Sequence, residues 1–336
     1  MAKFWNSTKR WLPGAIFSLI AIAAILYFVD LHRFMDAIRS ANYGLLLAFL
    51  LLSFFWLIIR GIVWWTLLRK QVPYRKVFWT LGEGYLLNNI LPFRLGEFGR
   101  AFLLSRKSSL GFMEIFSTII IERMVDVIYS GAILLIAVPF VVGAKGAEVF
   151  AIVIGGLLIL GLILLYFISR NRERFMGGYD LLTRHSSKLQ ELGKKFLDPL
   201  LSGFSVLNNG WLFLRFFLWM TFNWMVAIFQ FFILILAFFP RASLIWSFFG
   251  LGAVAFGNAI PSLPGAIGTF EASLAGALTL VSHKEATSLA LAVTDHVIGY
   301  LVTGATGLYA LSREGETLLE IYRQIRVRMG KPRVEN

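Results

Sequence analysis

Apolar runs long enough to cross a lipid bilayer recur along the whole of this 336-residue chain. A transmembrane helix needs roughly 20 consecutive apolar residues, and within the lipid core a helix satisfies all of its own backbone hydrogen bonds. Only 15% of the residues are charged and 58% are hydrophobic, whereas soluble domains carry about 25% charged residues. The sequence therefore predicts an all-α polytopic membrane protein with a single transmembrane domain over residues 1–336.

Two of the apolar segments are interrupted by proline and glycine, so we expect broken or re-entrant helical hairpins there rather than full spans. The first arm of the first hairpin, residues 77–91, would be only about 22 Å long, less than the hydrocarbon core of roughly 30 Å. The second hairpin has longer arms, and its sequence leaves open whether it is re-entrant or fully spanning. The predicted hairpins are 77–105 and 244–281, and the six predicted full spans are 11–29, 41–68, 111–140, 148–169, 211–238 and 285–312.

The loop charges favour an orientation with both termini in the cytoplasm. In that orientation the predicted cytoplasmic segments hold 22 Lys and Arg residues and the predicted outer loops hold 5, in agreement with the positive-inside rule. A basic loop at 170–198 and a tail at 313–336 would face the cytoplasm. We therefore expect a multi-pass protein of the plasma (cytoplasmic) membrane, the inner membrane of the cell. The net charge of +13 then indicates an anionic leaflet, rather than nucleic acid, as its partner.

Five polar or helix-breaking residues of the first half recur in the second half at one offset of 169 residues. This spacing predicts two internal repeats, about 41–140 and 211–312, and the single span 148–169 between them would give the repeats opposite orientations. Interrupted apolar segments at matching positions of inverted repeats indicate the substrate site of a transporter. The alternative is an old gene duplication that is retained only for packing. The matching pairs are Asn89 and Asn258, Pro92 and Pro261, Gly96 and Gly265, Gly99 and Gly268, and Asp126 and Asp295.

Ionisable residues at membrane depth are costly unless they are paired or hydrated, so each is a functional candidate. Arg215 and Glu114 lie close to predicted helix ends, where we expect their side chains to reach the membrane surface. Arg60 has two interpretations: it also reaches the surface, or it contacts an anionic headgroup. The charged residues within the predicted spans and hairpins are Arg60, Arg94, Arg100, Arg123, Arg215, Glu83, Glu97, Glu114, Glu122, Asp126, Glu271 and Asp295.

The break in the first hairpin carries the densest group of these charges. A helix that begins near Gly96 would direct its free N–H groups and the positive end of its dipole towards the hairpin tip, which favours an anion. Arg94 and Arg100 add two guanidinium groups, which bind phosphate through parallel hydrogen bonds. Glu97 would pair with either arginine. The alternative interpretation is a self-neutralised Arg–Glu–Arg cluster with a structural role.

Three further charged residues lie near the middle of the predicted span 111–140. Glu122 and Asp126 are four residues apart and share a helix face, and Arg123 is three residues from Asp126. We expect a buried brace that reaches the hairpin arginines. The pattern fits a structural role as well as a role in transport.

The second repeat carries fewer charges. Asp295 lies beside His296, and this pair is compatible with a proton relay or with a hydrogen bond between a helix and the hairpin. Glu271 is an isolated acid on the second arm of its hairpin. We expect Asn89 and Asn258 to cap the broken helix ends and to hold the hairpin tips together.

Signatures of other chemistry are missing from the sequence. Cysteine is absent, the four histidines lack metal-ligand spacing, and neither a nucleotide-binding loop nor a nucleophile elbow occurs. We therefore expect no cofactor, no metal, no catalytic residue and no enzymatic activity. An intramembrane transferase that uses a glutamate or aspartate as its base is the weakest alternative, since no nucleophile–base pair accompanies those residues.

Three stretches resemble the lysylphosphatidylglycerol synthase transmembrane family: LNNILPFRLGEFGRA at 87–101, ERMVD at 122–126 and PSLPGAIGTFE at 261–271. The resemblance extends over about residues 10–315. In two-domain members of that family the membrane part is implied to move aminoacylated phosphatidylglycerol between leaflets, and a cytoplasmic domain makes this lipid. Only about 24 residues follow the last predicted span, so the resemblance implies lipid handling by a stand-alone member rather than lysyl transfer. It also implies that residues 94–100 and 122–126 form the headgroup site.

Together these observations predict a flippase or transporter that moves an anionic phospholipid or a lipid-linked sugar between the leaflets. Arg94, Arg100 and Arg123 would hold the phosphate, and movement would be downhill or coupled to an ion gradient. The alternative is a non-catalytic lipid-binding membrane scaffold for a separate glycosyltransferase or lipid synthase. A homodimer is compatible with either function.

Overall fold

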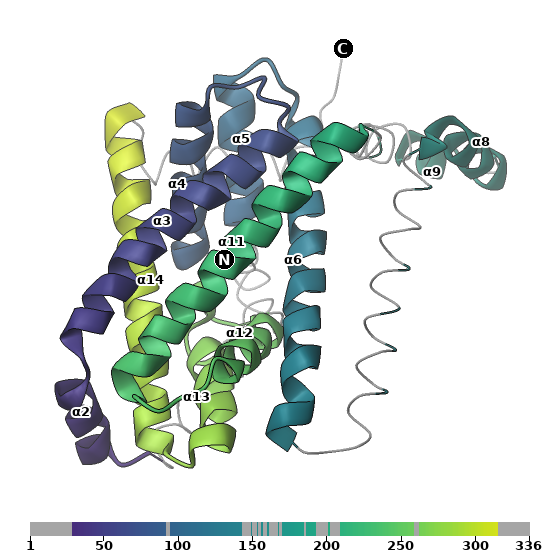
Figure 1. Cartoon of the computed structure of the whole chain (residues 1–336). Coiled ribbons are helices and arrows are strands. Elements are labelled where there is room, and N and C mark those ends of the chain that lie inside the picture. The colour runs from purple at the N-terminus through teal and green to yellow at the C-terminus, as the bar shows by residue number, and fades with distance from the viewer. Residues whose placement is uncertain are drawn as a thin grey trace, which may run out of the picture.

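The computed structural model of the protein describes residues 29–91, 95–142, 170–184, 186–192, 209–258 and 262–314, together with positions 149, 153, 156, 160, 167 and 201. The regular secondary structure of these residues is helical. The predicted spans 11–29 and 148–169 and the predicted tail 313–336 lie largely outside them. The predicted basic loop at 170–198 contains two short helices, α8 (Arg172–Leu182) and α9 (Ser187–Leu192), which Figure 1 places to one side of the main bundle.

Four long helices form the frame of the bundle, and each is long and apolar enough to cross a membrane. At 1.5 Å per residue, each exceeds the hydrocarbon core of roughly 30 Å. They coincide with four of the predicted spans to within a few residues, and the chain is a multi-pass membrane protein. The four are α3 (Tyr43–Leu67), α6 (Phe112–Val142), α11 (Gly210–Phe238) and α14 (Glu285–Glu314).

Shorter helices occupy the two predicted hairpins. They are α4 (Tyr74–Ile90) and α5 (Gly96–Lys107) in the first hairpin, and α12 (Ile245–Gly257) and α13 (Thr269–Ser282) in the second. With 17, 12, 13 and 14 residues, none reaches across the hydrocarbon core alone. A 3₁₀ turn, η4 (Pro264–Ala266), precedes α13, and the two together form a fifth apolar segment of 19 residues. Figure 1 shows α4 and α5 at one end of the bundle and α12 and α13 at the opposite end.

Two glycines allow close packing next to the breaks. A Cβ atom on Gly96 would lie 2.1 Å from the carbonyl oxygen of Gly84, so only glycine lets the start of α5 approach α4 this closely. Gly265 has a φ of 70°, which favours glycine, and a Cβ there would lie 1.5 Å from the Tyr300 hydroxyl oxygen. The end of α4 also lies against η4. The broken segments of the two halves therefore meet inside the bundle.

Helices of the first half of the chain pack against helices of the second half. Helix α3 packs along α11, α4 packs on α14, and α12 packs on α6. A further short helix, α2 (Leu31–Ser40), lies against α14. Large side chains such as Trp64, Phe216 and Phe231 are fully buried between the helices. Because lipid tails are as apolar as these side chains, close packing and polar contacts, rather than the hydrophobic effect, hold such helices together.

Candidate functional site

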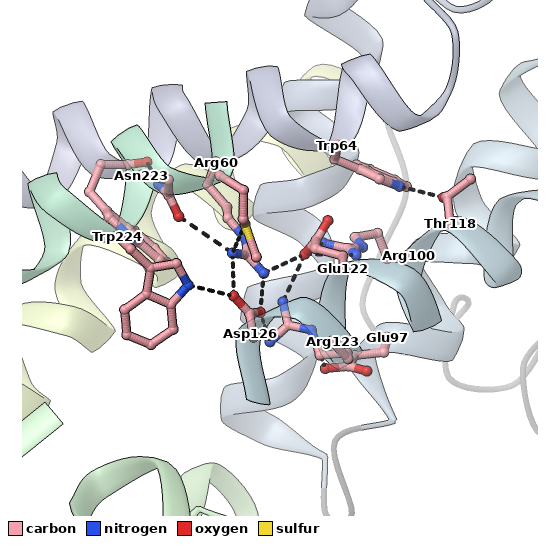
Figure 2. A network of polar contacts seen from close by, with 12 residues as sticks. Arg60, Trp64, Glu97, Arg100, Thr118, Glu122, Arg123, Asp126, Asn223 and Trp224 are labelled. Carbon is pink, nitrogen blue, oxygen red and sulfur yellow. Dashed lines mark hydrogen bonds and ion pairs between the residues drawn. The ribbon is translucent and has the colours of Figure 1, made fainter. Parts of the chain in front are cut away.

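A buried charged network joins α3, α5, α6 and α11 (Figure 2). Arg60 on α3 is only 2% exposed. Its Nη2 donates to Oε1 of Glu122 at 2.7 Å, and its Nη1 donates to Oδ1 of Asp126 at 2.9 Å. Nη2 also pairs with the second oxygen of Asp126. Because the two acids lie one turn apart on α6, Arg60 is held inside the bundle, and the interpretation that it reaches the membrane surface is wrong.

Two more arginines converge on the same carboxylate oxygen. Arg100 on α5 places Nη1 and Nη2 at 3.3 Å from Oε1 of Glu122, and Arg123 places Nη2 at 2.8 Å from it. Arg123 also lies 3.3 Å from Asp126 through Nη1 and 3.4 Å from Glu97 through Nε. The predicted brace of α6 therefore does reach the first hairpin, through Arg100 and Glu97.

The described part of this network contains three arginines and three acids, so its formal charges cancel. The pairing differs from the sequence interpretation, because Glu97 lies beside Arg123 and Arg100 pairs with Glu122. Arg94, which the sequence places in the same group, lies outside the described residues. Mutual neutralisation is what buried charges require, since an unpaired charge at this depth is strongly destabilising.

Aromatic and amide side chains complete the network, and the sequence pattern did not reveal them. The Arg100 guanidinium lies 4.2 Å from the ring centroid of Trp64, a cation–π contact. Trp224 on α11 donates from Nε1 to Asp126 Oδ1 at 3.3 Å, and Asn223 Oδ1 lies 3.4 Å from Arg60 Nη1. Asn223 is 1% exposed. It is a polar residue in the middle of an apolar span, and this could have marked it in the sequence as a candidate for the network.

Some buried atoms of the network have no hydrogen-bond partner among the described residues. These are Nε of Arg60, Nε of Arg100, Nε of Arg123 and Oε2 of Glu122. Buried polar atoms are nearly always satisfied in folded proteins. The network is therefore neutral in total charge, yet it retains donors and an acceptor for a further polar group.

A second polar cluster fixes the broken segment of the second half. His296 on α14 places Nδ1 at 2.5 Å from Oε1 of Glu271 and Nε2 at 3.0 Å from the carbonyl oxygen of Gly265. Tyr300 donates its hydroxyl to that same carbonyl at 2.7 Å, and the backbone N–H of Gly268 donates to Glu271 at 2.7 Å. Glu271 is therefore not isolated, and His296 faces Glu271 rather than forming a relay with Asp295.

Both ring nitrogens of His296 face acceptors, a carboxylate and a carbonyl. His296 therefore links α14 both to Glu271 and to the η4 turn. The cluster fixes the η4 turn in place, because three of its four hydrogen bonds involve the backbone of Gly265 or Gly268.

The remaining predicted site residues are not gathered in one place. Asn89 lies inside α4 and donates from its side chain to Oγ1 of Thr303 at 2.9 Å, so it ties α4 to α14 rather than capping a helix. Asn258 is the C-terminal cap residue of α12 through its backbone. Asp295 is half-buried and makes no hydrogen bond or ion pair with other residues that the structure describes.

Among the described residues, no group of three His, Asp or Glu side chains is arranged to hold a metal ion. Glu83, another acid at membrane depth, pairs with Lys107 at 2.8 Å within the first hairpin. In the described part of the bundle, such polar side chains form ion pairs and hydrogen bonds between helices.

Comparison with known proteins shows which proteins the chain is similar to. The model of the family described as "Lysylphosphatidylglycerol synthase TM region" matches residues 11–307. A protein of Methanothermobacter thermautotrophicus named "UPF0104 membrane protein" is 21% identical over 333 residues, which cover 94% of this chain and 97% of that protein. No solved structure matches the chain.

Proposed function

This chain belongs to the lysylphosphatidylglycerol synthase TM-region family, and on that premise we propose that it moves an anionic lipid between the leaflets of its membrane. The cargo is an anionic phospholipid or a lipid-linked sugar. The protein acts without catalysing a chemical reaction and without a cofactor. It resides in the plasma (cytoplasmic) membrane with both termini in the cytoplasm.

The observation that carries this proposal is the meeting of two broken segments from opposite ends of the bundle. The end of α4 lies against η4, while the hairpins that contain them occupy opposite ends in Figure 1. Helix α4 packs on α14 as α12 packs on α6, a correspondence that supports inverted repeats at about 41–140 and 211–312. Such repeats, with interrupted helices at their junction, allow a central site to open towards each side in turn.

The charged network beside this junction is the proposed headgroup site. Arg100 and Arg123, together with Arg94, are the residues we assign to the phosphate. Since the described network is already neutral, a phosphate is accommodated only when it replaces a carboxylate as the partner of an arginine. Glu122 is the carboxylate that both arginines share, so exchange at Glu122 is the central step that we propose. Movement is downhill or coupled to an ion gradient.

Reconstitution tests the proposal. Purified full-length protein is placed in vesicles whose outer leaflet carries a fluorescent anionic phospholipid or lipid-linked sugar, and exchange is followed by chemical quenching of the outer leaflet. We expect exchange above that of protein-free vesicles, with loss of activity in Arg94→Ala and Arg100→Ala. Arg174→Ala, which changes an exposed arginine of α8, is the matched control. Absence of exchange for every headgroup class tried would overturn the proposal.

A second function is favoured by one specific observation, the pairing of Arg100 and Arg123 with acids of the chain itself. That pairing suits a network that only holds helices together. The chain would then be a lipid-binding scaffold for a separate glycosyltransferase or lipid synthase. An enzyme of this kind that co-purifies with the chain, and keeps its activity in the Arg100→Ala variant, would support the scaffold.

A further inference from the structure

A surface pocket of about 730 Å³ lies between the end of α3 and the start of α11. Three of its lining side chains are positively charged, and among the described residues that line it none is acidic. We name it the basic pocket; its lining includes Thr66, Arg69, Lys70, Asn209, Trp211 and Arg215. Nothing in the charged network contributes to it.

Two of the cations follow the end of α3. Arg69 and Lys70 both adopt left-handed backbone conformations, with φ of 52° and 57°, which turn the chain immediately after the helix. The Lys70 ammonium lies 4.8 Å from the ring centroid of Trp65, a contact that orients it. Cations also complement the negative end of a helix dipole. Taken alone, these two residues therefore have an ordinary structural explanation.

The positive charge near the start of α11 has no such structural explanation. A helix N-terminus carries partial positive charge and normally attracts acids, yet the first turn of α11 contains none. Its cap is the neutral Asn209, whose side chain accepts from the Leu212 N–H at 3.1 Å. Arg215 follows one turn later, half-buried, and makes no hydrogen bond or ion pair with other residues in the described part of the chain. Arg215 therefore adds positive charge at this helix start without an acid beside it among the described residues.

The basic pocket is separated from the charged network by an apolar layer. Val63, Leu67, Phe216 and Met220 pack together between the two helices, and none of them is more than 1% exposed. Along α3, Thr66 lies about 9 Å from Arg60 at 1.5 Å per residue. An anion in the basic pocket would consequently not touch the arginines of the network.

We propose that the basic pocket binds the phosphate group of an anionic phospholipid at the level of the inner-leaflet headgroups. Arginine binds phosphate through two parallel hydrogen bonds. Trp211 at the edge of the pocket is 75% exposed, as is typical of tryptophan at the membrane interface. The orientation inferred from the loop charges puts residues 69–76 on the cytoplasmic side, where anionic lipids attract basic residues. This site holds lipid whether or not the protein moves it.

Lipid binding to the purified full-length protein tests the site. Native mass spectrometry measures the affinity for dioleoylphosphatidylglycerol and for dioleoylphosphatidylcholine in the wild type and in Lys70→Gln/Arg215→Gln. We expect the affinity for phosphatidylglycerol to fall about tenfold or more, and the weaker binding of phosphatidylcholine to stay unchanged. The matched control, Arg174→Gln/Arg313→Gln, removes two exposed cations that do not line the pocket and keeps wild-type affinity.

Three outcomes would overturn the proposal. The first is unchanged affinity for phosphatidylglycerol in the pocket variant. The second is an equal loss in the control variant, which would assign the effect to overall charge. The third is displacement of the lipid by an equal concentration of inorganic phosphate, which would assign the pocket to free phosphate. Arg215→Lys, which keeps the charge but loses the paired hydrogen bonds, gives an intermediate affinity and serves if the double variant does not fold.

The binding experiment and the exchange experiment test the two proposals separately. Selective binding in the basic pocket without lipid exchange in vesicles would support the pocket and overturn the flippase function. Lipid exchange without selective binding would support the flippase function and overturn the pocket.

Discussion

The charged network and the basic pocket each bring together three positively charged side chains, but they differ in the acids that line them. In the network, each of the three described arginines faces an acid at 3.4 Å or less. In the basic pocket, none of the described lining residues is acidic. Burial explains the difference, because a charge inside the bundle is tolerated only with a partner, whereas a cation at the membrane interface is stabilised by water and lipid phosphates. We therefore expect Lys70 and Arg215 of the pocket to bind an anion directly, while the network must first release one of its own.

Removing the shared carboxylate of the network should have the largest effect. Glu122→Gln leaves three guanidinium groups, two of them buried, with one acceptor fewer and an excess of positive charge. We expect a loss of about 3–5 kcal/mol of stability, the range for breaking a buried ion pair, seen as a lower thermal unfolding midpoint of the purified protein. Glu114→Gln, in the first turn of the same helix, is the control. Equal midpoints for the two variants would mean that the network does not hold the helices together.

Arg100→Gln separates the structural role of the network from its role in transport. Arg100 gives Glu122 its longest contacts, 3.3 Å, and also stacks on Trp64. We expect a loss of about 1–3 kcal/mol, the range for a hydrogen bond to a charged group. Lipid exchange measured well below the unfolding midpoint should nevertheless be abolished. Lipid exchange that persists in the folded variant would show that Arg100 has only a structural role, and would favour the scaffold function.

The sequence predicts the long helices and the breaks well, because both depend on local features. The length of an apolar run determines α3, α6, α11 and α14, and the prolines and glycines determine where α4 and α12 end. The i, i+4 spacing of Glu122 and Asp126 likewise predicts that they act together. These features depend on the local sequence alone, so they can be predicted without knowing how the helices are rotated against one another.

The partners of these residues were less accessible, because they depend on that rotation. Arg60 lies 66 residues before Asp126, and His296 lies 25 residues after Glu271. Sequence proximity instead suggests a pairing of His296 with Asp295. The cations of the basic pocket are each explained singly by the positive-inside rule or by their place near a helix end. Their convergence appears only when the ends of α3 and α11 are placed side by side.

Arg215→Gln should affect stability little until lipid is added. Without lipid we expect the change to stay within about 0.5 kcal/mol, since no ion pair with a described residue is lost. Phosphatidylglycerol at 100 times its dissociation constant should stabilise the wild type by about 2.7 kcal/mol, and should stabilise the variant less. The unfolding midpoint with and without phosphatidylglycerol measures both effects, and phosphatidylcholine is the control lipid. A large loss of stability without lipid would indicate that Arg215 has a structural partner, as the network arginines do.

Ionic strength should produce the smallest effect, and it compares the two regions in one protein without any substitution. Raising the salt concentration from 0.1 M to 1 M shortens the screening length from about 10 Å to about 3 Å. Binding of phosphatidylglycerol in the open basic pocket should weaken several-fold, because its charges are exposed to the solution. The unfolding midpoint without lipid should hardly move, because Arg60 and Glu122 are buried and salt does not reach them. A midpoint that falls together with the lipid affinity would mean that water and ions enter the network, and burial would then no longer distinguish the two regions.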